Sequence, residues 1–176
     1  MDEEFAKQKI QEWYDIHSDE IYRFIVMLTG DQEVAKDLMH DTFLKSYFSL
    51  QHYQGKVSVK NWLYRIARSV TIDYQRRARP VAFFLQEWNL LSVDEGNCPQ
   101  KIVELGETEV HLYAALSKLK HSYKEVIVLR KLKEMSIHET AEVLDWSEAK
   151  VKTTLFRAQL ALKKQLEKEG YIHENI

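Results

Sequence analysis

The stretch from Met135 to Leu166 constrains the fold most strongly, because it has the pattern of two helices joined by a tight turn. Ser136 is a good N-cap, and Glu139 stands three residues later, which is the spacing of a capping box. A second helix start follows at Ser147, where the acidic Glu148 in the first turn suits the helix dipole. The pattern predicts two helices that cross and pack against each other.

The second of these helices separates its apolar and polar side chains. Its apolar residues recur at helical spacing: Val151, Leu155, Ala158, Leu162 and Leu166. The side roughly opposite carries polar and basic residues: Lys150, Thr153, Arg157 and Lys164. The exposed first turns of such a helix can enter the major groove of DNA. The pattern therefore favours nucleic-acid binding, although a helical hairpin with a solvated charged face would share it.

The composition favours an all-α fold. Only five Gly and two Pro occur among the 176 residues, too few for the many turns of an all-β chain. The chain has a single cysteine, Cys98, which excludes an internal disulfide and a multi-cysteine zinc site. A chain without disulfides suits the reducing cytosol. The acidic start and the lack of a long apolar run predict no signal peptide and no membrane insertion, hence a cytoplasmic protein.

Charge divides the chain into three parts. Residues 1–80 carry 12 basic and 12 acidic side chains, residues 81–109 carry 1 and 6, and residues 110–176 carry 12 and 9. We therefore predict two small helical domains, residues 1–80 and 107–176, joined by an acidic and apolar linker, residues 81–106. With a net charge of −2 the chain neutralises few phosphates, so it should need a larger partner to hold it on DNA.

Caps and breakers give the expected bounds of the other helices. Ser18 and Asp31 precede helical patterns, and Pro80 should end one. Ser122 and Glu125 repeat the capping-box spacing. The expected helices cover residues 3–16, 18–28, 32–50, 58–79, 107–119 and 122–133.

The helix expected at residues 58–79 carries a stripe of arginine. One of its sides holds Asn61, Arg65, Arg68, Ser69, Arg76 and Arg79, with Trp62 at the border. Guanidinium groups bind phosphates and exposed aromatic rings stack on bases, so this side suits a nucleic-acid strand. Alternatively the arginines are merely solvated and Trp62, Tyr64 and Tyr74 are core residues; for Trp62 the sequence does not separate burial from base contact.

The helix expected at residues 32–50 combines acidic and apolar side chains. Asp37 and Asp41 are four residues apart, and Leu44 and Phe48 continue the same side. Two interpretations of this side are open: a protein-docking surface, or a solvated edge whose apolar residues turn inward.

Patterns of catalytic residues are weak throughout the chain. His138-Glu139 begins like the helix of a zinc protease, but Glu142 occupies the place of the second histidine. Neither a Gly-rich phosphate loop nor a serine nucleophile elbow occurs. We therefore expect no enzyme, no catalytic residue, no metal and no cofactor.

Taken together, these segments resemble an extracytoplasmic-function (ECF) sigma factor, one of the small two-domain initiation factors of bacterial transcription. The resemblance covers nearly the whole chain. It rests on residues 37–43 (DLMHDTF), residues 62–68 (WLYRIAR) with Ile72-Asp73, and residues 151–158 (VKTTLFRA). In the helix pair Asp145 replaces the glycine usual in this family; because Asp tolerates the left-handed conformation better than most residues, we expect the turn to be kept.

The resemblance implies that the N-terminal domain binds core RNA polymerase and the minus-ten element of the promoter. The implied polymerase contacts are Asp37, Leu38, Asp41, Phe43 and Leu44. The loop of residues 54–59 would hold a flipped-out base. The implied contacts with minus-ten DNA are Lys56, Asn61, Trp62, Arg65, Arg68, Ser69 and Arg76.

The resemblance also implies that the C-terminal domain binds the minus-thirty-five element, while the linker threads towards the active-site channel of polymerase. Members of the family are often held inactive by an anti-sigma factor, commonly membrane-anchored. The implied partners are thus core RNA polymerase, promoter DNA and an anti-sigma factor. The implied contacts with minus-thirty-five DNA are Ser147, Lys150, Thr153, Thr154 and Arg157.

Two other functions are open from the sequence. A stand-alone helix-turn-helix repressor or activator, with an N-terminal sensor domain, would explain residues 110–176 but not the arginine stripe. A helical adaptor for protein interactions would make both basic faces coincidental. A repressor should bind duplex DNA alone, whereas an initiation factor should become specific only with polymerase.

Overall fold

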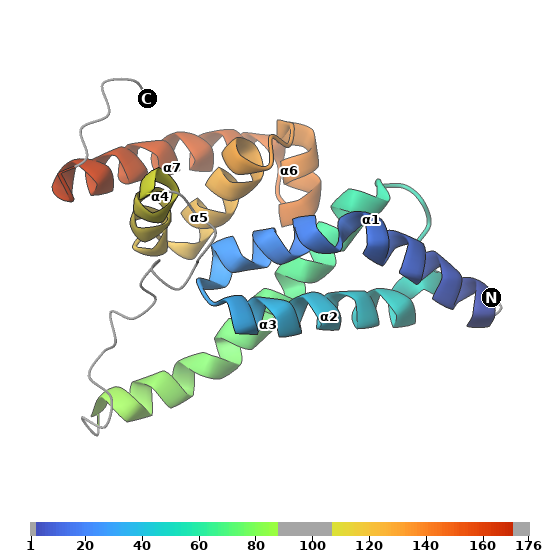
Figure 1. Ribbon diagram of the computed structural model, residues 1–176. Helices are drawn as coiled ribbons and strands as arrows, with labels where there is room; N and C mark the ends of the chain where they lie inside the picture. Colours follow the sequence, from blue (N-terminus) through green and yellow to red (C-terminus); the bar gives the residue numbers. More distant parts are fainter. Residues whose placement is uncertain (1–2, 88–106, 171–176) are drawn as a thin grey trace. The chain divides into compact units, whose positions relative to one another are not determined.

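The computed structural model describes residues 3–87 and 107–170, and the regular elements in these two ranges are all helices (Figure 1). The all-α prediction is therefore confirmed. The chain divides into two compact units, Met1–Asn97 (unit 1) and Cys98–Ile176 (unit 2). Most of the predicted linker, residues 81–106, lies outside the described residues, as does Cys98.

Unit 1 consists mainly of α1 (Glu3–Thr29), α2 (Gln32–Ser49) and α3 (Val59–Glu87), each of which packs against the other two. Figure 1 shows α1 and α2 running side by side in opposite directions. The predicted cap of α2 is confirmed, because the Asp31 carboxylate accepts a 3.0 Å hydrogen bond from the backbone N–H of Val34. The largest fully buried side chains include Phe24 from α1 and Tyr64 from α3, whose ring centroids lie 4.8 Å apart.

The first helix is longer than predicted. We expected a new helix to start at Ser18, but α1 runs without a break from Glu3 to Thr29. No Gly or Pro interrupts this span, and buried side chains continue across the expected break from Trp13 to Ile21. Burial of one continuous apolar stripe therefore outweighs the preference of Ser18 for a cap position.

The third helix also exceeds its predicted end. We expected it to end before Pro80, but α3 continues to Glu87. A proline removes one hydrogen bond from a helix, yet its fixed φ angle is compatible with helical backbone. One such residue therefore marks a possible helix end without enforcing it.

Unit 2 contains α4 (Glu107–Ser117), α5 (His121–Ile127), the π-helical turn η3 (Val128–Leu132), α6 (Ile137–Leu144) and α7 (Glu148–Lys168). The long helix α7 packs against each of α4, α5 and α6. Four of its five predicted apolar residues are buried, and the fifth, Leu155, is half-buried. The buried four are Val151, Ala158, Leu162 and Leu166.

The capping box predicted at Ser122 is wrong. Helix α5 begins one residue earlier, and its N-cap residue, Lys120, makes no capping hydrogen bond through its side chain. Glu125 is buried instead, with a carboxylate oxygen 3.2 Å from Nε2 of His121. The Ser-x-x-Glu spacing occurs here inside the helix, where it has no capping role.

Across the two described ranges, no helix has the length and apolar character that a membrane crossing requires.

Candidate nucleic-acid interface

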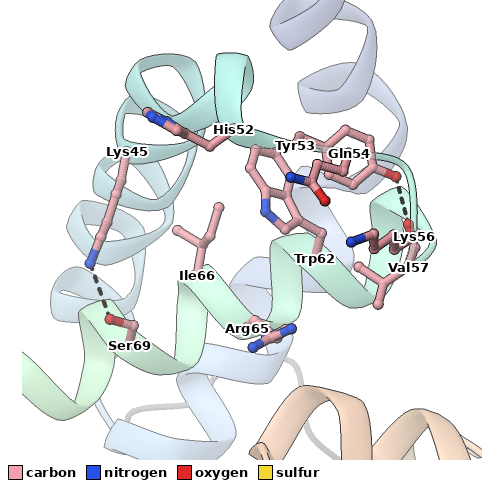
Figure 2. A pocket seen from close by; sticks show the side chains of 10 residues that line it. All are labelled: Lys45, His52, Tyr53, Gln54, Lys56, Val57, Trp62, Arg65, Ile66 and Ser69. Carbon is pink, nitrogen blue, oxygen red and sulfur yellow. Dashed lines mark hydrogen bonds between the residues drawn. The ribbon is translucent and has the colours of Figure 1, made fainter.

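A pocket of about 400 Å³ lies in unit 1, beside the loop that joins η1 (Leu50–His52) to α3. Its wall combines side chains from α2, from η1, from this loop and from the first turns of α3, which Figure 2 shows from close by. Segments far apart in the sequence thus form one site. The lining residues are Lys45, His52, Tyr53, Gln54, Lys56, Val57, Trp62, Arg65, Ile66 and Ser69.

Three aromatic rings anchor the loop. The ring centroid of Tyr53 lies 4.8 Å from that of Trp62 and 5.7 Å from that of Trp13, and the two tryptophan centroids are 5.8 Å apart. The Tyr53 hydroxyl donates a 2.7 Å hydrogen bond to the carbonyl oxygen of Val57, as Figure 2 shows. Burial raises the pKa of Tyr53, so this hydroxyl remains a donor to higher pH than an exposed tyrosine does. Gly55, which lies between Tyr53 and Val57 in the chain, has a φ of 68°, a value that favours glycine.

The pocket is electropositive. Lys45, Lys56 and Arg65 belong to its wall together with His52, and none of its ten lining residues is acidic. The Lys45 ammonium donates a 3.1 Å hydrogen bond to Oγ of Ser69, which links α2 to α3 at one side of the pocket (Figure 2). Aromatic rings bordered by cations are the combination that binds single-stranded nucleic acid, because rings stack on bases while cations bind phosphates.

Four of the seven residues predicted to contact minus-ten DNA line this pocket: Lys56, Trp62, Arg65 and Ser69. Arg76 is exposed further along α3, and Arg68 is half-buried. Asn61 is only 3% exposed, so its side chain lies inside unit 1 and does not fit a direct contact with DNA in this conformation.

Sequence reasoning missed Lys45, His52 and Tyr53 as pocket residues. The last two directly precede the loop that was expected to hold a base, so their position was an available signal. Lys45 comes from the middle of α2, and only the packing of α2 against α3 brings it to the pocket.

The exposed edge of α2 carries three of the five predicted polymerase contacts. Asp37, Asp41 and Leu44 are exposed, and Leu44 is 56% exposed. Leu38 and Phe43 are buried, 5% and 4% exposed, so they support this edge from inside. Leu44 and Phe48 do not turn inward, because they are 56% and 67% exposed, so the solvated-edge interpretation is wrong for these two residues and the docking surface stays a prediction.

Two shallow grooves flank Leu44, which lines both of them. One, of about 410 Å³, lies between α2 and α3 and includes Asp41 and the exposed Phe48. The other, of about 560 Å³, lies between α1 and α2 and includes Tyr14 and Phe43. Together they give this edge of unit 1 a recessed apolar surface beside acidic side chains.

In unit 2 the starts of α6 and α7 and the turn between these helices have the predicted caps. Both hydrogen bonds of the Ser136 and Glu139 capping box are present. Oγ of Ser147 accepts a 3.2 Å hydrogen bond from the backbone N–H of Lys150 at the start of α7. Asp145 has a φ of 55° and a ψ of 47°, which is the left-handed conformation expected of it. The structure thus confirms a helix-turn-helix.

The outer side of α7 presents most of the predicted DNA contacts. Ser147, Lys150, Thr153 and Arg157 are exposed, whereas Thr154 is half-buried. Phe156, which sequence reasoning did not select, is 64% exposed beside Arg157. Its place off the apolar stripe of α7 was the signal that could have identified it.

Comparisons with known proteins match both units of the chain. The Sigma-70 region 2 family matches residues 13–81, and the Sigma-70, region 4 family matches residues 110–162. The RNA polymerase sigma factor YlaC of Bacillus subtilis is 35% identical, over 92% of this chain and 94% of that protein. The ECF RNA polymerase sigma factor SigM of the same organism is 32% identical, over 88% and 93%.

The chain belongs to the ECF sigma factor family. Its fold agrees with this assignment: the structure of the sigma factor RpoE in complex with the anti-sigma factor NepR from Bartonella quintana matches with a TM-score of 0.69. That match covers 91% of this ECF sigma factor and 98% of the solved chain, at 18% identity. In the described residues of this ECF sigma factor, no cluster of three or more His, Cys, Asp or Glu is arranged to hold a metal ion.

Proposed function

We propose that this ECF sigma factor binds core RNA polymerase and directs it to specific promoters, acting as a transcription initiation factor in the cytoplasm rather than as an enzyme. Unit 1 binds polymerase and the minus-ten element, and unit 2 binds the minus-thirty-five element. The observation that carries the proposal is the pocket at the start of α3, whose wall is aromatic and cationic without any acidic residue. The domains expected from the sequence, residues 1–80 and 107–176 with residues 81–106 as the linker, correspond to units 1 and 2, but α3 extends the first domain to at least Glu87.

The pocket suits a base that has left the DNA stack. Flipping a base out costs a few kcal/mol, which contacts in the receiving pocket must offset. The rings of Tyr53 and Trp62 offer apolar surface, while Lys56 and Arg65 stand where they can neutralise the flanking phosphates. Arg68 and Arg76 extend the positive charge along α3 and would guide the rest of the strand.

The exposed edge of α2 is the proposed polymerase-binding surface. Asp37 and Asp41 supply negative charge, and Leu44 supplies an exposed apolar anchor between two grooves. Central apolar anchors carry much of the binding energy of protein interfaces, and surrounding charges set orientation and association rate. The buried Leu38 and Phe43 keep this edge in shape.

We further propose control by an anti-sigma factor. A sigma factor of the same fold, RpoE, has been crystallised with the anti-sigma factor NepR. A second structure of this fold is that of CnrH in complex with the cytosolic domain of CnrY (TM-score 0.67, 22% identity). An anti-sigma factor that covers the α2 edge or α7 would compete with polymerase or with DNA. Such a protein can itself be anchored in the membrane.

Footprinting with and without core RNA polymerase tests the proposal against its alternatives. The isolated chain should protect duplex DNA poorly, because its net charge is only −2 and few phosphates are neutralised. Addition of core enzyme should give protection at defined upstream positions. Strong specific protection by the chain alone would support a repressor or activator, and no protection under either condition would support an adaptor.

A further inference from the structure

We propose that Trp146 is a positioning residue for DNA recognition: its indole ring holds the ammonium group of Lys150 at the start of α7. The contact would fix how Lys150 meets the major groove and hence which base pair unit 2 prefers there. This inference rests on the proposed function, in which α7 binds duplex DNA.

The backbone of Trp146 is held at the end of α6. The Trp146 N–H donates a 3.0 Å hydrogen bond to the carbonyl oxygen of Ala141, and the Asp145 N–H donates a 3.4 Å bond to that of Glu142. With Asp145 in the left-handed conformation, this pair of bonds is a Schellman motif that closes the end of α6. These bonds fix the backbone of Trp146, and hence its Cα–Cβ direction, directly before the N-cap residue Ser147.

The side chain of Lys150 is held over that ring. Its Nζ atom lies 4.2 Å from the centroid of Trp146, within the range of a cation–π interaction. Its backbone N–H is held as well, through the 3.2 Å hydrogen bond to Oγ of Ser147. A lysine side chain is flexible, and ordering it on binding costs affinity. A lysine that is already held at both ends loses less freedom when it meets DNA.

The nearest acidic residue on α7 is directed elsewhere. Oε1 of Glu148 lies 3.3 Å from Nδ1 of His138, which belongs to α6. Side chains two residues apart in a helix do not face each other, so Glu148 is also poorly placed to reach Lys150. The indole, an uncharged partner, leaves the positive charge of Lys150 available to a phosphate or a guanine.

Sequence selection by the holoenzyme, followed by a double-mutant cycle, tests the proposal. The probe is a duplex library with a randomised upstream segment, bound by core RNA polymerase carrying the full-length chain. Affinity for the most enriched duplex is then measured for Trp146→Leu, Lys150→Met and the double variant. We expect Trp146→Leu to weaken binding about two- to tenfold, because Lys150 must then be ordered on binding. Lys150→Met should weaken binding at least as much, because the contact with DNA is lost, and the double change should add little to the effect of Lys150→Met.

Lys152 provides the matched control, because it is an exposed lysine of the same helix. The effects of Trp146→Leu and Lys152→Met on duplex affinity should add. The effects of Trp146→Leu and Lys150→Met on duplex affinity should not add. Independent effects of Trp146→Leu and Lys150→Met in a holoenzyme that still selects a sequence would overturn the proposal. Failure of the unmodified holoenzyme to select any sequence would instead refute the proposed function.

Two measurements guard against a loss of folding in the Leu variant. Trp146→Phe keeps an aromatic face and should restore part of both the affinity and the base preference, which a purely structural role does not predict. In the free protein, NMR should show the side-chain CH₂ protons of Lys150 shifted upfield by the indole, and this shift should vanish in Trp146→Leu. Unshifted Lys150 resonances in the unmodified chain would contradict the contact itself.

Discussion

The Tyr53 hydroxyl donates a 2.7 Å hydrogen bond to the carbonyl oxygen of Val57 and thereby closes the loop that forms one wall of the pocket in unit 1. The same ring packs against Trp62 and Trp13. Tyr53 therefore has two functions: its hydroxyl anchors the loop and its ring presents an aromatic surface. Since the hydroxyl and the ring act separately, a substitution that removes only the hydroxyl separates the two functions.

Replacing Tyr53 by Phe should weaken promoter opening while the ring stays in place. Loss of one part-buried hydrogen bond costs about 0.5–1.5 kcal/mol, and the loop would then sample conformations that do not form the pocket. Permanganate footprinting of the melted region by the holoenzyme measures the effect. Tyr123→Phe in unit 2 is the control, and equal footprints for the two variants would contradict the role of the Tyr53 hydroxyl.

The substitution Leu44→Asp should reduce affinity for core RNA polymerase by at least about tenfold, as expected when an anchor residue is lost from a binding surface. The Leu44 side chain is 56% exposed and lies between two grooves, where a partner can bury it. Calorimetry or fluorescence titration with core enzyme provides the measurement. Ile16→Asp is the control, since Ile16 is an exposed apolar residue of α1 that lines neither groove. If both variants bind alike, the α2 edge is not the docking surface.

At position 145 the structure predicts opposite effects for two substitutions. Asp145 has a left-handed backbone, which costs a residue with a Cβ roughly 1–2 kcal/mol and glycine much less. Asp145→Gly should therefore raise the free energy of unfolding of unit 2, and the β-branched Asp145→Val should lower it. Urea unfolding followed by circular dichroism tests both, and stabilisation by valine would show that the turn adopts another conformation.

Local signals made the helix-turn-helix predictable. Ser136, Ser147 and Asp145 act through hydrogen bonds and backbone preferences within a few residues of themselves, and the sequence shows these directly. The starts predicted at Ser18 and Ser122 used the same kind of signal and were wrong. At Ser18 the burial of a continuous apolar stripe along α1 outweighs the cap preference of serine, and at Ser122 the helix has already begun one residue earlier.

The pocket was only partly predictable for a related reason. The loop residues and Arg65 follow from a family resemblance and from helical spacing, but Lys45 joins them through contacts between α2 and α3. Spacing also places Asn61 on the arginine side, whereas the structure buries it. Periodicity gives the direction of a side chain within one helix and cannot show what the neighbouring helix covers.

Acid should weaken the link between α4 and the end of α7. The hydrogen bond from Lys118, 2.8 Å long, lowers the pKa of Glu169 below its usual 4.5. Because the carboxyl pKa of Glu169 is lower in the folded than in the unfolded chain, ionised Glu169 stabilises the fold above pH 4.5. This stabilisation is lost as the pH falls from 4.5 through the lowered pKa of the folded state. The Lys118→Met variant should thus be less stable than the parent by roughly 0.5 kcal/mol at pH 7, a size typical of exposed pairs.

The pH dependence of this difference is the test. Urea unfolding of the parent and of Lys118→Met should give a gap that narrows below pH 4.5 and closes in stronger acid. Lys168→Met, which changes an exposed lysine of α7 near Glu169, should show a gap that depends little on pH. A gap for Lys118→Met that stays constant down to strong acid would show that Glu169 does not provide the stabilisation.

Start-site mapping by in vitro transcription tests the central claim most directly. Core RNA polymerase transcribes a promoter library with no added factor, with the parent chain, or with the Arg65→Glu and Arg68→Glu double variant. Arg23→Glu, which reverses an exposed arginine of α1, serves as the control. The account predicts new, discrete start sites with the parent and with Arg23→Glu, and their loss with the double variant. Unchanged start sites on addition of the parent chain, or full activity of the double variant, would contradict it.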